Sequence, residues 1–221
     1  MNRKIDIFGI GITVLTAKDT MKTAMQYLES ETVHAVEIMT LELLMQEKED
    51  EIWREQIQQM DLVLPGEKAL FATTELSDRM ILKDLENRTF LRMFFRYLKK
   101  NKKTIYLLAE GEEELEKMKN FLKGYSHSLA IAGQAVLSPG NGSEETVINE
   151  INGVEPDCIL SGLSSPYGEQ FIVRSKALLN ARLWIGGILS LARLAEKKPI
   201  GKLGAFIRKK IFCYQIEKQK H

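Results

Sequence analysis

The chain has 221 residues, of which 44% are hydrophobic and only five are proline, so it is long enough to bury one large core. Its 31 Lys and Arg residues nearly balance 30 Asp and Glu residues, which argues against nucleic acid as a partner. No window approaches the ~20 apolar residues of a membrane-spanning helix, and residues 1–15 resemble a strand more than a signal peptide, so the sequence predicts a cytoplasmic protein.

Short β-rich runs alternate with longer segments of helical period along the chain. We expect strands at 5–14, 35–39, 61–65, 104–110, 128–132, 158–162 and 183–185. We expect helices after an N-cap at Thr16 and at 41–48, 50–60, 68–75, 88–100, 112–124, 144–152 and 169–179. This alternation predicts one Rossmann-like α/β domain over residues 1–200, with a mostly parallel sheet flanked by helices.

The remaining residues, 201–221, form a basic C-terminal segment. From Arg193 to His221 there are nine Lys and Arg residues and two Glu, which leaves the rest of the chain net acidic. Residues 205–216 mix large apolar side chains with Arg208, Lys209 and Lys210. This pattern predicts a basic amphipathic helix, which either rests on the inner face of a membrane or packs on the domain and exposes its lysines.

Open α/β sheets bind ligands beyond the carboxyl ends of their strands, so the loops that follow strands are the candidate binding sites. Four of them, at 40–44, 64–68, 162–172 and 184–190, connect a strand to a helix whose N-terminus could face a diphosphate. The alternative is that Gly and Pro merely end the strands. We predict no cofactor, because Gly9 and Gly11 lack the third glycine of the dinucleotide fingerprint. We also predict no metal, because His34 and His127 have no partner at ligand spacing.

Five segments, taken together and in order, resemble one protein family. They are FGIGITVLTAKDTMKTA, DLVLP, IYLLAEGEEELEKM, INEINGVEPDCILSGLSSP and WIGG. The series is similar to the WecG/TagA/CpsF family of bacterial enzymes, which transfer N-acetylmannosamine or a related sugar from a nucleotide donor to a lipid-linked acceptor. The resemblance implies a UDP-sugar donor, a lipid-linked acceptor and a role in cell-surface polysaccharide or teichoic-acid synthesis.

The resemblance also implies a set of nucleotide-sugar-binding residues. Pro166 and Glu169 remain from a family loop of proline, lysine, glutamine and glutamate, and Gly186 and Gly187 match a double glycine. Ser190 stands where the family has an aspartate. We therefore expect the donor to contact Ser164, Pro166, Tyr167, Glu169, Gly186, Gly187 and Ser190.

The chain departs from the family at polar positions. Ile38 and Thr40 stand where the family has threonine and asparagine ahead of a glutamate, which Glu42 matches. Gly66 replaces the family's proposed catalytic-base aspartate, and the family's arginine and aspartate are not recognisable at 84–90. A histidine-rich turn is replaced by residues 133–136.

Glu67 and Glu42 are the candidates for the catalytic base. Each is also an ordinary residue for the first turn of a helix. The sequence thus leaves two main hypotheses. The chain is either a glycosyltransferase or a catalytically inactive paralogue that binds a ligand or partners an active enzyme in a homo- or hetero-oligomer. A third hypothesis is an adaptor that binds the membrane through its basic C-terminal tail. Convergence of Glu42, Glu67 and Glu169 on one cleft would favour the enzyme.

Overall fold

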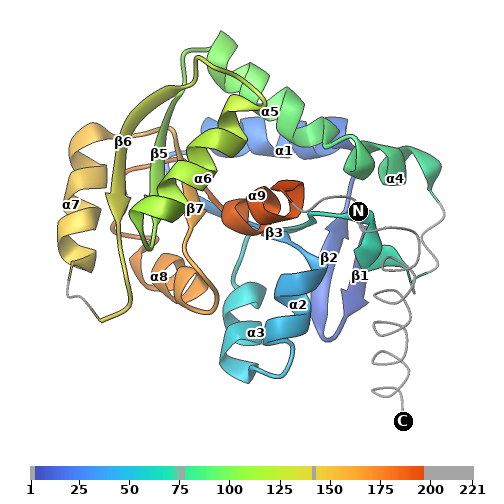
Figure 1. The fold of residues 1–221 in the computed structure, drawn as a ribbon. Coiled ribbons are helices and arrows are strands. Elements are labelled where there is room, and N and C mark those ends of the chain that lie inside the picture. The colour runs from blue at the N-terminus through green and yellow to red at the C-terminus, as the bar shows by residue number, and fades with distance from the viewer. Residues whose placement is uncertain (1–2, 73, 75–77, 141–142, 197–221) are drawn as a thin grey trace.

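The computed structural model describes residues 3–72, 74, 78–140 and 143–196, and shows a six-stranded sheet between two layers of helices (Figure 1). The strand order is β4-β3-β8-β7-β5-β6, and every neighbouring pair is parallel. The strands are β3 (His34–Met39), β4 (Leu62–Pro65), β5 (Thr104–Ala109), β6 (Ala130–Val136), β7 (Cys158–Gly162) and β8 (Leu183–Gly186). The predicted Rossmann-like α/β fold is confirmed.

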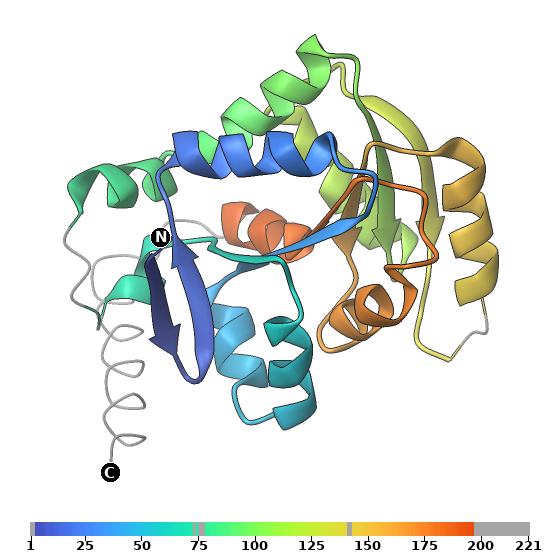
Figure 2. The same ribbon diagram turned by 180° about the vertical axis from the view of Figure 1, so that it is seen from behind.

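Side chains alternate between the two faces of this sheet and build a core on each. In β5, Ile105 and Leu107 belong to one core, whereas Tyr106 and Leu108 belong to the other. The first core is covered by α1 (Ala17–Leu28), α5 (Thr89–Lys100), α6 (Glu112–Lys123) and α9 (Ile188–Glu196). The second is covered by α2 (Leu41–Glu47), α3 (Glu51–Gln58), α7 (Glu144–Val154) and α8 (Tyr167–Ser175) (Figure 2).

The first predicted strand, residues 5–14, is wrong as a single strand. It is a hairpin of β1 (Arg3–Ile7) and β2 (Ile10–Val14), which pair with each other and not with the parallel sheet. Phe8 and Gly9 form the two-residue turn with φ of 57° and 79°. A turn of this kind needs positive φ at both positions, and Gly9 supplies one without strain. Apolar residues continue through the turn and hide it in the sequence, although their alternation shifts by one residue between Ile7 and Ile10.

Two further local predictions can be compared with the structure, and one of them is confirmed. The predicted cap at Thr16 is present, because its Oγ1 accepts the Asp19 N–H at 3.1 Å. The predicted helix 68–75 is shorter, a single 3₁₀ turn (η1, Lys68–Phe71), and the polar stretch after it contains α4 (Arg79–Glu86), capped by Asp78.

One predicted strand and one predicted helix have different ends in the structure. The predicted strand 128–132 lies two residues later and runs to Val136, since β6 is an exposed edge strand without a continuous apolar pattern. The predicted helix 169–179 starts and ends earlier, at Tyr167 and Ser175.

The C-terminal segment 201–221, with Arg208, Lys209 and Lys210, lies outside the described residues. Within the described ranges, no helix is long and apolar enough to cross a membrane.

Candidate functional site

A pocket lies at the carboxyl ends of β3, β7 and β8. The helices that follow the neighbouring strands β3 and β8 pack on opposite faces of the sheet, α2 through Leu44 and α9 through Ile188. A crevice opens at such a switch point, and open α/β sheets bind their ligands there. We call it the carboxylate pocket, because three glutamates line it together with four serines and one arginine: Glu37, Glu42, Glu169, Ser161, Ser164, Ser165, Ser190 and Arg193.

Glu169 is the most constrained of these carboxylates. It lies in the first turn of α8 and is only 3% exposed. Its Oε1 accepts hydrogen bonds from the Trp53 Nε1–H at 3.1 Å and from the Ser165 hydroxyl. Its Oε2 is buried without a hydrogen-bond partner among the described residues. Burial raises the pKa of Glu169, and the two hydrogen bonds oppose that rise.

Glu37 is a second buried carboxyl group beside it. It projects from β3 and is also 3% exposed. Burial raises its pKa well above the ordinary glutamate value, and the nearby charge of Glu169 adds to the rise. The two groups therefore disfavour being ionised together.

The double glycine Gly186 and Gly187 leaves room for Glu37. A methyl group on Gly186 would overlap the Glu37 carboxyl group, and one on Gly187 would overlap the Ile38 carbonyl oxygen. Gly187 also has a φ of 75°, which L side chains rarely adopt. These glycines are therefore required by close approach of strand β3 and not only by a turn.

Three helix N-termini surround the same pocket. Residues near the starts of α2, α8 and α9 line it, and Thr40 Oγ1 caps α2 by accepting the Leu43 N–H at 3.2 Å. Helix N-termini carry partial positive charge and free N–H groups that favour anions. The N–H groups of Leu41 and Leu43 at the start of α2 already donate to Glu67 and Thr40. The starts of α8 and α9, together with the exposed Arg193 on α9, are therefore the parts of the rim suited to a diphosphate.

The structure brings most of the sequence-predicted residues to this pocket. Its lining includes Glu42, Ser164, Glu169, Gly186, Gly187 and Ser190. Glu67, Pro166 and Tyr167 are not part of the lining. The Glu67 carboxylate instead accepts the N–H of Leu41 at 2.9 Å, and the Tyr167 hydroxyl donates to Glu144 at 2.9 Å. Pro166 lies just before α8.

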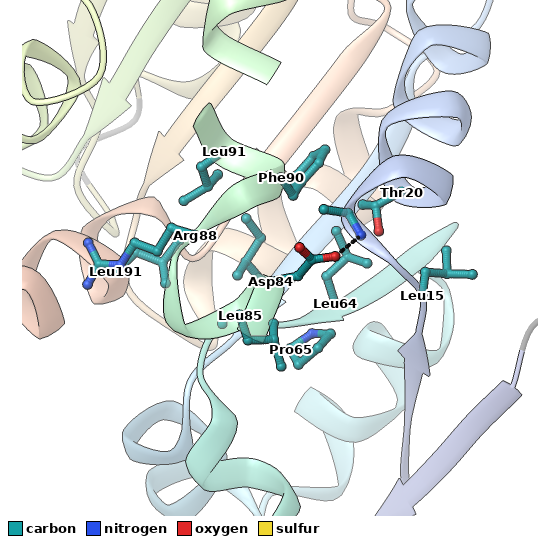
Figure 3. A pocket seen from close by; sticks show the side chains of 13 residues that line it. Leu15, Thr20, Leu64, Pro65, Asp84, Leu85, Arg88, Phe90, Leu91 and Leu191 are labelled. Atoms are coloured by element: carbon teal, nitrogen blue, oxygen red, sulfur yellow. Dashed lines mark hydrogen bonds between the residues drawn. The ribbon is translucent and has the colours of Figure 1, made fainter. Parts of the chain in front are cut away.

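Some of the positions that depart from the family, namely Ile38, Gly66 and residues of the segment 84–90, lie at a different pocket on the face of α1, α5 and α9 (Figure 3). Ser190, another departure, lies in the carboxylate pocket. We call the pocket on the face of α1, α5 and α9 the apolar pocket. Its lining is mostly hydrocarbon: Leu15, Ala17, Ile38, Leu64, Pro65, Gly66, Leu85, Phe90, Leu91 and Leu191. Asp84 and Arg88 are its charged members. Figure 3 shows Asp84 turned toward the start of α1, where it accepts the Ala17 N–H at 2.9 Å, while Arg88 extends away from it.

Sequence reasoning missed Glu37 in the carboxylate pocket and also Trp53, which lies outside the pocket lining and donates to Glu169. Glu37 had a readable signal, since it is the one acid in the otherwise apolar strand HAVEIM near the strand's carboxyl end. Trp53 had no readable signal in the sequence, because it is 116 residues from its partner Glu169. Among the described residues, no group of three or more His, Cys, Asp or Glu side chains is arranged to hold a metal ion.

Comparison with known proteins agrees with this architecture. The model of the glycosyl transferase WecG/TagA/CpsF family matches residues 5–199, which is most of the chain. No curated protein matches the chain. The match spans the parallel sheet, both pockets and all the described helices. The chain therefore belongs to the WecG/TagA/CpsF family of glycosyl transferases.

Proposed function

We propose that the carboxylate pocket binds a UDP-activated N-acetylhexosamine and that the protein transfers this sugar to a lipid-linked acceptor. The observation that carries the proposal is the buried carboxyl group of Glu169, a residue of the pocket lining, whose Oε2 has no hydrogen-bond partner in the described chain. A buried acceptor without a donor is rare and costly, so a ligand that brings a donor is favoured there. Sugar hydroxyl and amide groups are such donors.

The two parts of the donor molecule fit two parts of the pocket. The buried pair Glu37 and Glu169 suits the uncharged, hydroxyl-bearing sugar, because carboxyl oxygens accept hydrogen bonds from sugar hydroxyl groups. The diphosphate suits the rim, where the N-termini of α8 and α9 and Arg193 oppose its charge. The serines at 161, 164, 165 and 190 add hydroxyl groups between them.

Transfer requires a base for the acceptor hydroxyl group. The acceptor oxygen attacks C1 of the sugar, the bond from C1 to the phosphate oxygen breaks, UDP leaves, and the hydroxyl proton passes to the base. Glu42 is the best candidate for this base, because it is an exposed carboxylate on the pocket lining. Glu67 is committed to the Leu41 N–H at the start of α2. By family membership, the product would enter cell-surface polysaccharide or teichoic-acid synthesis at the cytoplasmic face of the membrane.

One observation favours a second candidate, a catalytically inactive paralogue that binds the donor or partners an active enzyme. Gly66 occupies the position of the family's proposed base, and the apolar pocket around it offers hydrocarbon where that base would act. In this case the carboxylate pocket binds the sugar nucleotide and no transfer follows.

The experiment for donor binding is calorimetric titration with UDP and with a UDP-N-acetylhexosamine. Glu169→Gln keeps the shape of the side chain and removes its charge, whereas Glu169→Ala removes the acceptor. We expect Glu169→Ala to weaken binding of the sugar nucleotide by roughly tenfold or more, and binding of UDP alone by less. Asp84→Ala, at the apolar pocket, is the control and should leave both affinities unchanged. No binding of either ligand to the unaltered chain would overturn the proposal.

Transfer is tested separately by UDP release that depends on a lipid-linked acceptor. Release that falls in Glu42→Gln while donor affinity persists supports the transferase. Donor binding without any acceptor-dependent release supports the inactive paralogue instead.

A further inference from the structure

The outward surface of α5 and the turn after it is strongly basic. Between Asn87 and Lys103 the chain has seven Lys and Arg residues and no Asp or Glu: Arg88, Arg92, Arg96, Lys99, Lys100, Lys102 and Lys103. The whole chain has a net charge of only +1, so this surface is a local concentration of charge and not the overall composition.

Helical geometry places the cations on one stripe. Leu91, Phe94, Phe95 and Leu98 form the buried face of α5. The opposite face therefore presents Arg92, Arg96 and Lys99, at spacings of four and three residues, and all three are exposed.

These cations have no acidic partners in the described part of the chain. Arg92, Arg96 and Lys99 form no ion pair there, although Arg88 lies over the Phe121 ring at 5.8 Å and Lys103 pairs with Asp157 at 2.8 Å. The neighbouring helix α6 is different, because Lys117 and Lys119 on it pair with Glu113 and Glu116. Like charges three and four residues apart repel, and an anionic partner would relieve that repulsion.

The stripe forms one wall of a groove. Arg92, Arg96 and Lys99 line it together with Gly124, Tyr125, Ser126 and Ser128, beyond the end of α6. The groove continues past Arg92 to Arg88 and Phe121, and Arg88 also lines the apolar pocket. Two acids, Glu196 and the Lys68 partner Glu86, line this far part of the groove and not the part beside Arg96 and Lys99. Cations, hydroxyl groups and an aromatic side chain thus follow one another beside a hydrocarbon-lined opening.

We infer that this surface, the α5 groove, rests on an anionic membrane and holds lipid headgroup phosphates against Arg92, Arg96 and Lys99. Exposed methionines distinguish a membrane from a nucleic acid as the partner. Met93 on α5 is 37% exposed and Met80 on α4 is 60% exposed, and such apolar side chains among cations suit the lipid interface. The membrane contact is independent of sugar transfer.

The test is sedimentation of the full chain with phosphatidylcholine vesicles, with and without phosphatidylglycerol. The variant Arg92→Glu/Arg96→Glu/Lys99→Glu reverses the stripe. The control, Arg3→Glu/Lys4→Glu/Arg174→Glu, makes the same change in net charge at exposed sites on other elements. The C-terminal lysines are identical in both variants, so any difference between them reports the α5 groove.

We expect binding only to the phosphatidylglycerol vesicles and a decline of that binding with salt. The stripe variant should lose roughly a hundredfold in affinity, since each basic residue near such a surface contributes about fivefold. The control should lose much less, and both variants should keep the circular dichroism of the parent.

Three results would overturn the inference. They are no vesicle binding by the parent, equal losses in both variants, and stripe-dependent binding to a single-stranded oligonucleotide that is tighter than vesicle binding at the same salt.

Discussion

The carboxylate pocket and the apolar pocket lie at the same edge of one sheet, yet their chemistry is opposite. The adjacent residues Glu37 and Ile38 of β3 point to opposite faces and so belong to different pockets. The carboxylate pocket has buried acids, serines and helix N-termini, whereas the apolar pocket is lined mostly by hydrocarbon and its one acid, Asp84, accepts the Ala17 N–H. The contrast teaches that the two faces of one strand can build sites of opposite polarity, and both the proposed donor site and the proposed base, Glu42, lie on the polar face.

The first prediction asks whether the apolar pocket can regain an acid. In Gly66→Asp the new Cβ would lie 2.9 Å from the Met39 carbonyl oxygen and 3.0 Å from Leu191 Cδ2, and the carboxylate would enter a hydrocarbon environment. We expect a loss of about 2–4 kcal/mol in the free energy of unfolding, measured by urea denaturation. A Gly66→Asp protein as stable as its parent would show that the two pockets are not as different as described.

The second prediction concerns the hydrogen bond from Trp53 to Glu169 in the carboxylate pocket. Trp53→Phe keeps the aromatic packing and removes the N–H that donates to Glu169. We expect a loss of about 1–3 kcal/mol in unfolding free energy, because the Glu169 carboxyl group loses a buried donor. The loss should be accompanied by weaker binding of the UDP-sugar. Trp184→Phe is the control for the unfolding measurement, since its indole group is also buried but does not donate to Glu169. Equal effects of the two substitutions would contradict a special role for the Trp53 hydrogen bond.

The third prediction uses the raised pKa values of Glu37 and Glu169. Above the ordinary glutamate pKa, the unfolded chain is ionised while these folded groups retain protons, so unfolding releases protons. The free energy of unfolding should therefore fall as the pH rises from the ordinary value toward the raised folded pKa, by about 1.4 kcal/mol for each unit of difference.

Glu37→Gln should flatten that decline and stabilise the protein at the upper end of the range. Denaturation curves measured at several pH values, with exposed Glu55→Gln as the control, test this expectation. An unchanged slope in Glu37→Gln would mean that Glu37 is not the titrating group.

The fourth prediction has the smallest expected effect and tests whether a change at the apolar pocket leaves binding of the UDP-sugar unchanged. Asp84→Ala removes the acceptor of the Ala17 N–H at the start of α1. We expect a loss of about 1 kcal/mol in unfolding free energy, as for other helix-cap acceptors, with unchanged affinity for the UDP-sugar. A marked change in that affinity would show that the apolar pocket takes part in donor binding.

Much of the fold could be predicted from local patterns. Buried strands such as DLVLP and helices such as α6 show their period and their end signals in the sequence, so the parallel sheet followed directly. The hairpin was missed because the apolar run continues through its two-residue turn, although the step of three residues from Ile7 to Ile10 breaks the alternation there. The order of strands in the sheet has no local signal, since it depends on which helices cross which face.

The candidate site was predictable only in part, for the same reason. Glu42, Glu169 and the double glycine follow strands, so the rule that ligands bind beyond strand ends placed them. Glu67 also follows a strand, but its side chain reaches back to cap α2. The Trp53–Glu169 hydrogen bond and the pairing of Glu37 with Glu169 join distant segments, so only the folded chain reveals them.

The most direct test of the account uses the two tryptophans of the chain, Trp53 and Trp184. Both are buried; Trp184 lines the carboxylate pocket and Trp53 donates its Nε1–H to Glu169. The indole N–H signals can be followed by NMR during titration with a UDP-N-acetylhexosamine and assigned with Trp53→Phe. The account predicts that the Trp53 signal shifts with the same saturation as calorimetric binding and that Glu169→Ala removes the shift. Saturable binding that leaves both indole signals unmoved would place the ligand elsewhere and contradict the account.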